Sequence, residues 1–159
     1  MTWQAYTEYK DSGIEWLGEI PEHWAFNWLR HLFRFEKGKK AQLYTKEYVG
    51  IYPGDFPVYS GQTEGDGVLG HIDTFDYDTN KSILVTTVGA KAMSTKIVKG
   101  KYSLSQNCAL FVSKNQELSC IYYEGLLADI FRYERGSISL IMQPSLRFED
   151  LHKYGSSPI

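Results

Sequence analysis

Amide, hydroxyl and lysine side chains gather in three short segments of the sequence. The segments read SGQTEGDG (60 to 67), AKAMSTK (90 to 96) and YSLSQN (102 to 107). Lysines and backbone amides suit phosphate oxygens, whereas amide and hydroxyl side chains suit the base edges of a major groove. For any single residue, a loop that hydrogen-bonds its own backbone is the better explanation. As a set, these residues favour recognition of a nucleic acid.

The TTVGAKAMSTK segment (86 to 96) is the main predicted contact loop. A plain hairpin needs only two turn residues, so a longer insertion flanked by lysines favours a contact surface. We expect Gly89 to permit the turn, and Lys91 and Lys96 to meet phosphates. Met93 or an alanine could touch a thymine methyl group. The complete set of predicted DNA-binding residues is Lys39, Lys40, Gln62, Thr63, Lys91, Met93, Ser94, Thr95, Lys96, Lys99, Gln106 and Asn107.

Charge is distributed unevenly along a chain whose net charge is only −2. Residues 79 to 116 contain six lysines and no aspartate or glutamate, and KGKK (37 to 40) forms a second basic cluster. The first 24 residues are acidic instead, with five carboxylates against one lysine. Such asymmetry can mark one face for an anion. A solvated lysine face explains the charge pattern about equally well.

The sequence gives little support to catalytic or metal-binding chemistry. GDGVLG (65 to 70) matches the dinucleotide-binding fingerprint, but the HIDTFDYDTN that follows has no helical period, so we expect a glycine-rich surface loop. The four histidines lack metal-ligand spacing, and no Cys-x-x-Cys pair is present. Serines in the strand-like region have no recognisable catalytic base. We therefore expect no catalytic residue, no metal ion and no cofactor on this chain, and an enzyme with an unrecognised site is a third alternative.

Short β-type runs are expected to position the polar loops. These runs are YVGIY (48 to 52), FPVYS (56 to 60), SILVTTV (82 to 88), TKIV (95 to 98) and CALFV (108 to 112). Apolar residues recur at spacings of three and four residues in ELSCIYYEGLLADIFRY (117 to 133). This spacing predicts a helix, with Asn115 as a plausible N-cap. A second helix is predicted over 24 to 35, and closing strands over 137 to 142 and 145 to 148. The pattern indicates an α+β domain with a mostly β centre.

Length and composition are those of one globular domain. A chain of 159 residues with 43% hydrophobic and 15% aromatic residues can bury a sizeable core. No apolar stretch approaches the roughly 20 residues that span a bilayer, and the first residues do not resemble a secretory signal. Cys108 and Cys120 lie in apolar runs and are expected to be buried thiols rather than a disulfide. We expect a cytoplasmic protein.

Several segments resemble, in order, the successive parts of one known family. YKDSGIEWLGEIPEHW (9 to 24) resembles the opening of the specificity subunits of type I restriction-modification systems. PVYSGQTEGDGVLGHIDTF, ILVTTVGAKAMSTKIVKGKYSLSQNCALF and SLRFEDL resemble later segments of the target recognition domain in that family. The resemblance covers the chain from about Tyr9 to Tyr154.

The resemblance implies a fold, a function and a set of partners. The implied fold is a curved, mostly β core like a double β-helix, with helices packed on it. The implied function is sequence-specific binding of double-stranded DNA, without catalysis, at one half of a bipartite site. Methyltransferase subunits that bind S-adenosylmethionine, and through them a restriction subunit, are the implied partners.

The same resemblance implies domain boundaries. We expect one target recognition domain over 1 to 159, with an irregular acidic and aromatic segment at 1 to 24, a recognition core at 25 to 154 and a tail at 155 to 159. In the family a proline-rich junction and a long spacer helix follow this domain, whereas this sequence stops at HKYGSSPI. The chain could therefore act mainly as a protein-interaction module that docks on a methyltransferase subunit through residues 8 to 24.

Overall fold

The computed structural model describes residues 6–13, 18–23, 27–61, 65–89, 92–116, 118–137 and 155–156. The strands are β1 (Tyr9–Asp11), β2 (Glu19–Pro21), β3 (Asn27–Trp28), β4 (Phe33–Lys37), β5 (Pro53–Tyr59), β6 (Val68–Ile72), β7 (Tyr77–Thr86), β8 (Thr95–Leu104), β9 (Cys108–Ser113) and β10 (Gly155–Ser156). The helices are α1 (Leu29–Leu32), α2 (Lys46–Ile51) and α3 (Cys120–Ser137), and a 3₁₀ turn, η1, spans Gly65–Gly67.

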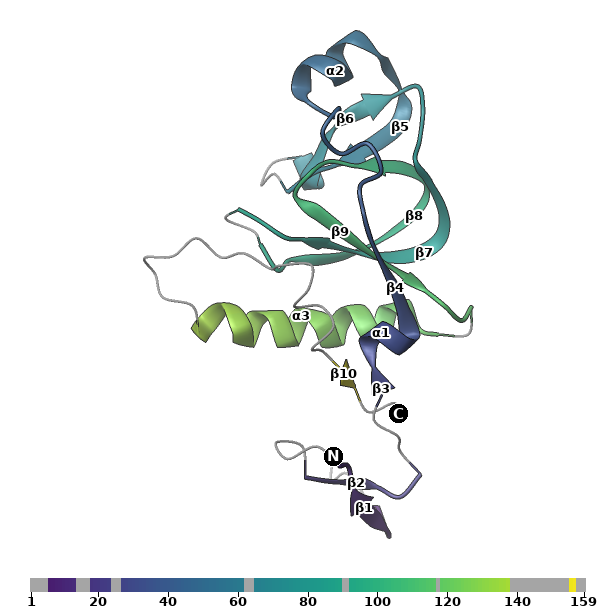
Figure 1. Cartoon of the computed structure of the whole chain (residues 1–159), viewed down its shortest axis with the longest axis vertical. Helices are drawn as coiled ribbons and strands as arrows, with labels where there is room; N and C mark the ends of the chain where they lie inside the picture. Colours follow the sequence, from purple (N-terminus) through teal and green to yellow (C-terminus); the bar gives the residue numbers. More distant parts are fainter. Residues whose placement is uncertain are drawn as a thin grey trace.

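A curved six-stranded sheet forms the centre of the molecule, with strand order β4-β9-β7-β8-β5-β6 (Figure 1). Strands β7, β8 and β9 pair antiparallel, and β4 extends them at one edge through β9. At the other side β5 runs parallel to β8 over two residue pairs and antiparallel to β6. Together with the helices α1, α2 and α3 of the described residues, this mixed sheet confirms the predicted α+β class with a mostly β core.

Both faces of the sheet are buried, because strand residues alternate between them. Ile83 and Val85 belong to a core cluster that includes Leu127 and Phe131 of α3. Leu84, between them on β7, belongs to a second cluster on the concave side of the sheet. A third, smaller cluster lies where the α2 region packs on β5 and β6. The helix α3 thus closes the convex side, as Figure 1 shows.

The helix α3 confirms the prediction made from apolar spacing. Its buried residues Cys120, Tyr123, Leu127 and Phe131 recur every three or four positions, so they form one stripe that faces the sheet. The cap differs from the prediction. The hydroxyl of Ser119 accepts a hydrogen bond from the Tyr122 N–H at 3.3 Å, a typical N-cap contact.

Two predicted elements are wrong. Residues 24 to 35 do not form one helix, because the chain enters β3, makes a single turn at α1 and then pairs with β9 as β4. Residues 48 to 52 do not form a strand. They lie in and just after α2, which the Thr45 hydroxyl caps by accepting from the Tyr48 N–H at 3.2 Å. In both segments tertiary pairing or a local cap outweighs intrinsic propensity.

Other predicted elements agree with the structure. The predicted strands at 56 to 60, 82 to 88, 95 to 98 and 108 to 112 overlap β5, β7, β8 and β9. GDGVLG leads into strand β6 and not into a helix, which fits a turn and excludes a dinucleotide fingerprint. Both cysteines are free and buried, as predicted.

The remaining elements lie near the termini. The segment predicted to be irregular contains a short antiparallel hairpin, β1–β2, at the end of the molecule opposite α2 (Figure 1). The predicted strands at 137 to 142 and 145 to 148 lie outside the described residues, apart from Ser137 at the end of α3. Among the helices in the described ranges, none combines the length and the apolar character that a bilayer crossing requires.

Candidate nucleic-acid interface

Three turns meet at one end of the sheet. The Thr87 N–H donates to the Asn107 carbonyl at 2.9 Å, which joins the β7–β8 loop to the β8–β9 turn. The Ser105 N–H donates to the Tyr59 carbonyl at 2.8 Å, which joins that turn to the end of β5. We call this end of the sheet the loop face, and it comprises residues 37–46, 60–61, 65–67, 86–89, 92–96 and 105–107.

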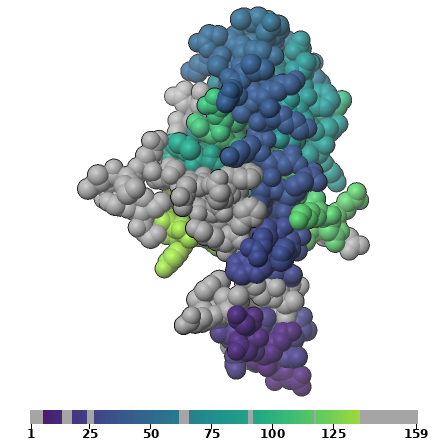
Figure 2. Space-filling model, in the orientation of Figure 1, coloured from purple at the N-terminus to yellow at the C-terminus, as the bar shows by residue number. Residues whose placement is uncertain are grey.

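The loop after β4 completes this face. A hollow of 260 Å³ is lined by residues of that loop together with the β5 end and the β8–β9 turn: Ala41, Gln42, Tyr44, Thr45, Lys46, Ser60, Gly61, Leu69, Ser105, Gln106 and Asn107. A neighbouring hollow of 570 Å³ is bounded by residues 37–43 and Gln106. In the space-filling view the residues from β4 to α2, coloured blue, run up this side of the molecule (Figure 2). The KGKK cluster therefore lies beside the predicted base-reading turn.

The β8–β9 turn presents two amide side chains to solvent. Gln106 and Asn107 are exposed, and the strands on both sides of them are buried. Within the described chain neither side-chain amide has a hydrogen-bond partner, although the Asn107 backbone carbonyl is used by Thr87. An amide with no internal partner can present both a donor and an acceptor to a base edge.

Asp76, whose side chain is buried, contacts two lysines of KGKK. The Asp76 side chain is 4% exposed, and the Lys40 Nζ lies 3.8 Å from its Oδ1. The Lys39 Nζ donates to the Asp76 backbone carbonyl at 2.8 Å and lies 4.6 Å from the centre of the Tyr77 ring. Both lysines are nevertheless exposed at the surface. We name this arrangement the Asp76 clasp.

Tyr44 completes the Asp76 clasp. Its O–H donates to the second Asp76 oxygen, Oδ2, at 2.7 Å. Burial, with the Asp76 carboxylate adding to it, raises the pKa of Tyr44 to about 12. The Asp76 N–H also donates to the Ser103 hydroxyl at 3.1 Å. The clasp therefore fixes the loop after β4 against the start of β7 and the end of β8.

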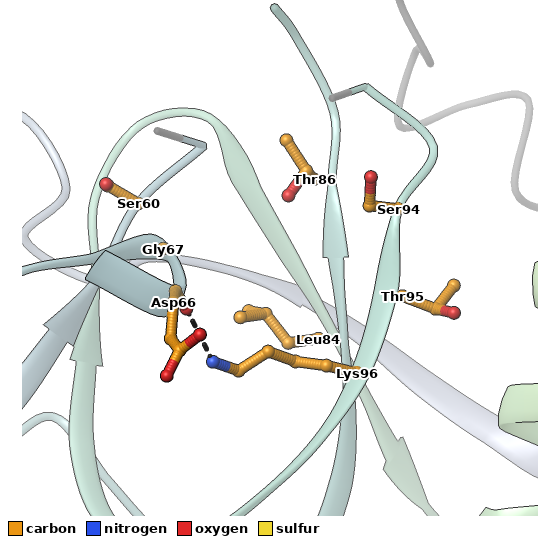
Figure 3. Close-up of a pocket in the computed structure, with 8 residues that line it drawn as sticks. All are labelled: Ser60, Asp66, Gly67, Leu84, Thr86, Ser94, Thr95 and Lys96. Atoms are coloured by element: carbon orange, nitrogen blue, oxygen red, sulfur yellow. Dashed lines mark hydrogen bonds between the residues drawn. The ribbon is translucent and has the colours of Figure 1, made fainter. Parts of the chain in front are cut away.

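Lys96 does not extend freely toward solvent. Its Nζ donates to the Asp66 carbonyl at 2.8 Å and lies 4.4 Å from the centre of the Tyr59 ring (Figure 3). It borders a hollow of 280 Å³ whose rim carries the hydroxyls of Ser60, Thr86 and Ser94. These contacts attach Lys96 to the η1 turn, and its phosphate contact, expected from sequence, stays a prediction.

Other predicted contacts are divided between this face and the rest of the molecule. Ser94 and Thr95 both line the same hollow, but the Thr95 hydroxyl is engaged, because it donates to Glu124 of α3 at 2.6 Å. Lys99 is exposed in the middle of β8, about 13 Å along the strand from Thr95. The structure thus brings together Lys39, Lys40, Ser94, Lys96, Gln106 and Asn107, and leaves Lys99 apart. Gln62, Thr63 and Lys91 lie outside the described residues.

The assignment of Met93 to a thymine contact is corrected. Its side chain is 6% exposed and belongs to the core cluster under α3. The residue has a φ of 65°, and its N–H donates to the Thr86 carbonyl at 2.6 Å, so the loop turns back on itself at this point. Burial of an apolar side chain of this size is worth about 1.5–3 kcal/mol, which explains why it faces the core.

Sequence reasoning missed two residues of this face and one that contacts it. Gln42 is exposed and lines both hollows beside the β8–β9 turn. Asp66 and Asp76 hold or border the lysine contacts described above. The glutamine follows KGKK by two positions, but nothing in the sequence indicates that this loop lies beside residue 106, because more than sixty residues separate them.

A second polar hollow lies at the opposite end of the central strands. It has a volume of 470 Å³ and is lined by Arg34, Asp78, Thr79, Asn80, Lys81, Val112, Ser113, Asn115, Gln116, Leu118, Ser119, Cys120 and Ile121. Its amides and cations make it a competing surface for an anion. The loop face has the more suitable form for a nucleic acid, because residues from six described segments converge there.

Comparison with known proteins identifies a protein family. The family described as "Type I restriction modification DNA specificity domain" matches residues 21–155. "Putative type I specificity subunit S.MpnORF201P" of Mycoplasma pneumoniae is 36% identical over 92 residues, which cover 58% of this chain and 37% of that protein. "Type I restriction enzyme MpnII specificity subunit" of the same organism is 34% identical over 89 residues, 56% of this chain and 26% of that protein. The matches thus span about a quarter to just over a third of these relatives.

Solved structures show a similar fold. The S subunit of a type I restriction-modification system from M. genitalium superposes with a TM-score of 0.62 at 17% identity, over 85% of this chain and 34% of that chain. A chain from a study of complex assembly and conformational transition of the type I R-M system superposes with a TM-score of 0.58 at 14% identity. The superposition covers 94% of this chain and 36% of that chain. At such identities the likeness concerns the fold.

Proposed function

The chain belongs to the type I restriction modification DNA specificity family, and from this premise we propose that it binds double-stranded DNA sequence-specifically. It acts in this proposal as a target recognition domain that reads one half of a bipartite site. The proposal assigns no catalytic step to this chain. Methyltransferase subunits carry S-adenosylmethionine and are positioned by the bound domain, and a restriction subunit joins through them.

One observation carries the proposal: the turn with Gln106 and Asn107, whose amides have no partner among the described residues, lies beside the exposed lysines Lys39 and Lys40. Lysines give affinity without sequence information, and amides give base discrimination. The two kinds of group must be adjacent to serve one duplex, and in this fold they are. The Asp76 clasp adds rigidity, which lowers the entropic cost of binding.

The lysines set the expected salt dependence. If Lys39, Lys40 and Lys46 each neutralise one phosphate, affinity falls about fortyfold between 50 and 200 mM salt, from a logarithmic slope near −0.9 per contact. Base readout adds about 1–3 kcal/mol for each recognised pair, so one domain is a modest binder. Joining two such domains raises the effective concentration, which gives a physical reason for two-part sites.

The experiment is selection from a randomised duplex pool with the methyltransferase subunit present. The wild-type chain should enrich a common half-site. A double variant, Gln106→Ala with Asn107→Ala, should bind DNA but enrich no half-site or a degenerate one, because the amides are lost and the lysines stay. Gln116→Ala is the matched control, since it removes an exposed amide at the opposite end of the sheet. Identical enrichment by wild type and the double variant would contradict the proposal.

The N-terminal hairpin supports a second candidate function. Tyr6 and Tyr9 are exposed and their rings lie 6.5 Å apart, next to the acidic residues of β1 and β2. Exposed tyrosines are enriched at protein interfaces. In this candidate the hairpin docks on a methyltransferase subunit. A pull-down of that subunit without DNA, lost in a Tyr6→Ala, Tyr9→Ala variant, would support it, and retention of the subunit by the variant would reject it.

A further inference from the structure

The η1 turn presents a carboxylate at the rim of the loop-face hollow. Asp66 is exposed, and its φ of 56° is a left-handed conformation, followed by Gly67 with a φ of 74°. Its backbone carbonyl accepts from Lys96, but the described residues provide no hydrogen bond or ion pair for its carboxylate. Figure 3 shows this side chain beside Lys96, across the hollow from Thr86 and Ser94.

Two contacts fix the position of this turn. The Lys96 ammonium donates to the Asp66 carbonyl and lies over the Tyr59 ring, so it is engaged by two groups of the protein. The Ser60 N–H donates to the Gly67 carbonyl at 2.6 Å. The turn is therefore attached to β5 on one side and to β8 on the other. The backbone that carries the carboxylate is therefore pre-organised, which favours specific recognition over general attraction.

The chemistry of the rim selects the kind of group that could bind. An ionised carboxylate accepts hydrogen bonds and donates none, and it repels phosphate. The donors on base edges in the major groove are the exocyclic amino groups of cytosine, N4, and of adenine, N6. Asp and Glu accept from cytosine N4 in known readout geometries. The Thr86 hydroxyl on the same rim can donate or accept beside it.

We propose that Asp66 is a specificity-determining residue whose carboxylate accepts a hydrogen bond from the exocyclic amino group of one cytosine or adenine in the target. Lys96 is a positioning residue that holds the turn and so aims the carboxylate. This inference rests on the proposed DNA-binding function. It assigns one base position of the half-site to the η1 turn and the other readout to the β8–β9 turn.

The test uses base analogues in the selected duplex, with the methyltransferase subunit present. Each cytosine is replaced in turn by 2-pyrimidinone and each adenine by purine, which removes only the amino group. Wild type should lose on the order of tenfold in affinity at the position that Asp66 reads. Asp66→Ala should show no loss at that position and keep its losses at the others. Asp78→Ala, an exposed carboxylate on the opposite hollow, should keep the wild-type profile.

Lys96→Met tests the positioning role. It should weaken discrimination at the same base position as Asp66→Ala while leaving the salt slope unchanged. A uniform loss of affinity for all duplexes, with a shallower salt slope, would assign Lys96 to a phosphate and overturn its positioning role. If the wild-type chain enriches a half-site and Asp66→Ala shows the same losses with the base analogues as wild type, the specificity role of Asp66 is overturned. Failure of wild type to enrich any duplex would instead reject the proposed function itself.

Discussion

At the scale of single residues, the Asp76 carboxylate helps to organise the loop face, because it accepts from the Tyr44 hydroxyl and lies near the Lys40 ammonium. Sequence reasoning placed Lys39, Lys40, Gln106 and Asn107 among the contacts, and the fold brings these four together. It could not find the Asp76 clasp, because an aspartate in a polar stretch has no pattern that indicates burial. It also misassigned Met93, since the direction of a loop side chain depends on the core beneath it.

The Asp76 clasp gives a stability prediction. Asp76→Ala should lower the free energy of unfolding by about 1–3 kcal/mol, because the Tyr44 hydroxyl loses its acceptor in a partly buried site. Urea denaturation measures this change. Asp78→Ala, two residues along the chain and exposed, should stay within about 0.5 kcal/mol of wild type. Equal effects of the two substitutions would show that the clasp contributes nothing.

Cys108 gives a pH prediction. Burial raises the pKa of its thiol from 9.0 to about 12, so the folded state keeps a proton that the unfolded state releases. Stability from this thiol is therefore complete below pH 9 and is lost as the pH rises from 9 to 12, by at most about 1.4 kcal/mol per pH unit. Urea denaturation at pH 8 and pH 10 measures the decline. Cys108→Ala should decline less than wild type, and an equal decline would contradict the assignment.

At the scale of elements, predictability follows the length and periodicity of each segment. The helix α3 repeats its apolar stripe over several turns, and β7 and β9 contain continuous apolar runs, so the sequence indicates them. The short elements α1, β4 and α2 depend on individual contacts and not on a long repeating pattern. Their type is decided by pairing with β9 and by the Thr45 cap.

The close approach of two turns at Gly61 gives a prediction at this scale. A Cβ at Gly61 would lie 2.9 Å from the Asn107 Cβ, so Gly61→Ala must displace the β8–β9 turn. We expect a loss of half-site enrichment together with about 1–3 kcal/mol of destabilisation from overpacking. Gly50→Ala in α2, where a Cβ meets nothing within 4 Å, is the control. It should keep the half-site enrichment and should not be destabilised. Wild-type enrichment by Gly61→Ala would show that the position of the turn is unimportant.

At the scale of the whole molecule, the fold separates surfaces of different chemistry. The β1–β2 hairpin lies at the end of the molecule opposite α2 (Figure 1). The loop face gathers lysines and amides from segments that are distant in sequence. The second polar hollow lies at the other end of the strands. The distribution of charge along the sequence predicted an asymmetry, but only the strand order shows which loops lie at the same end of the sheet.

The most direct test of the central claim is an amide chemical-shift titration of this chain with the selected duplex, which detects weak binding residue by residue. We predict that the largest changes fall on the loop face, centred on residues 105 to 107 and 39 to 46, with smaller changes at 79 to 81 and 113 to 116. Changes centred on those last two segments, with the β8–β9 turn unaffected, would contradict the account.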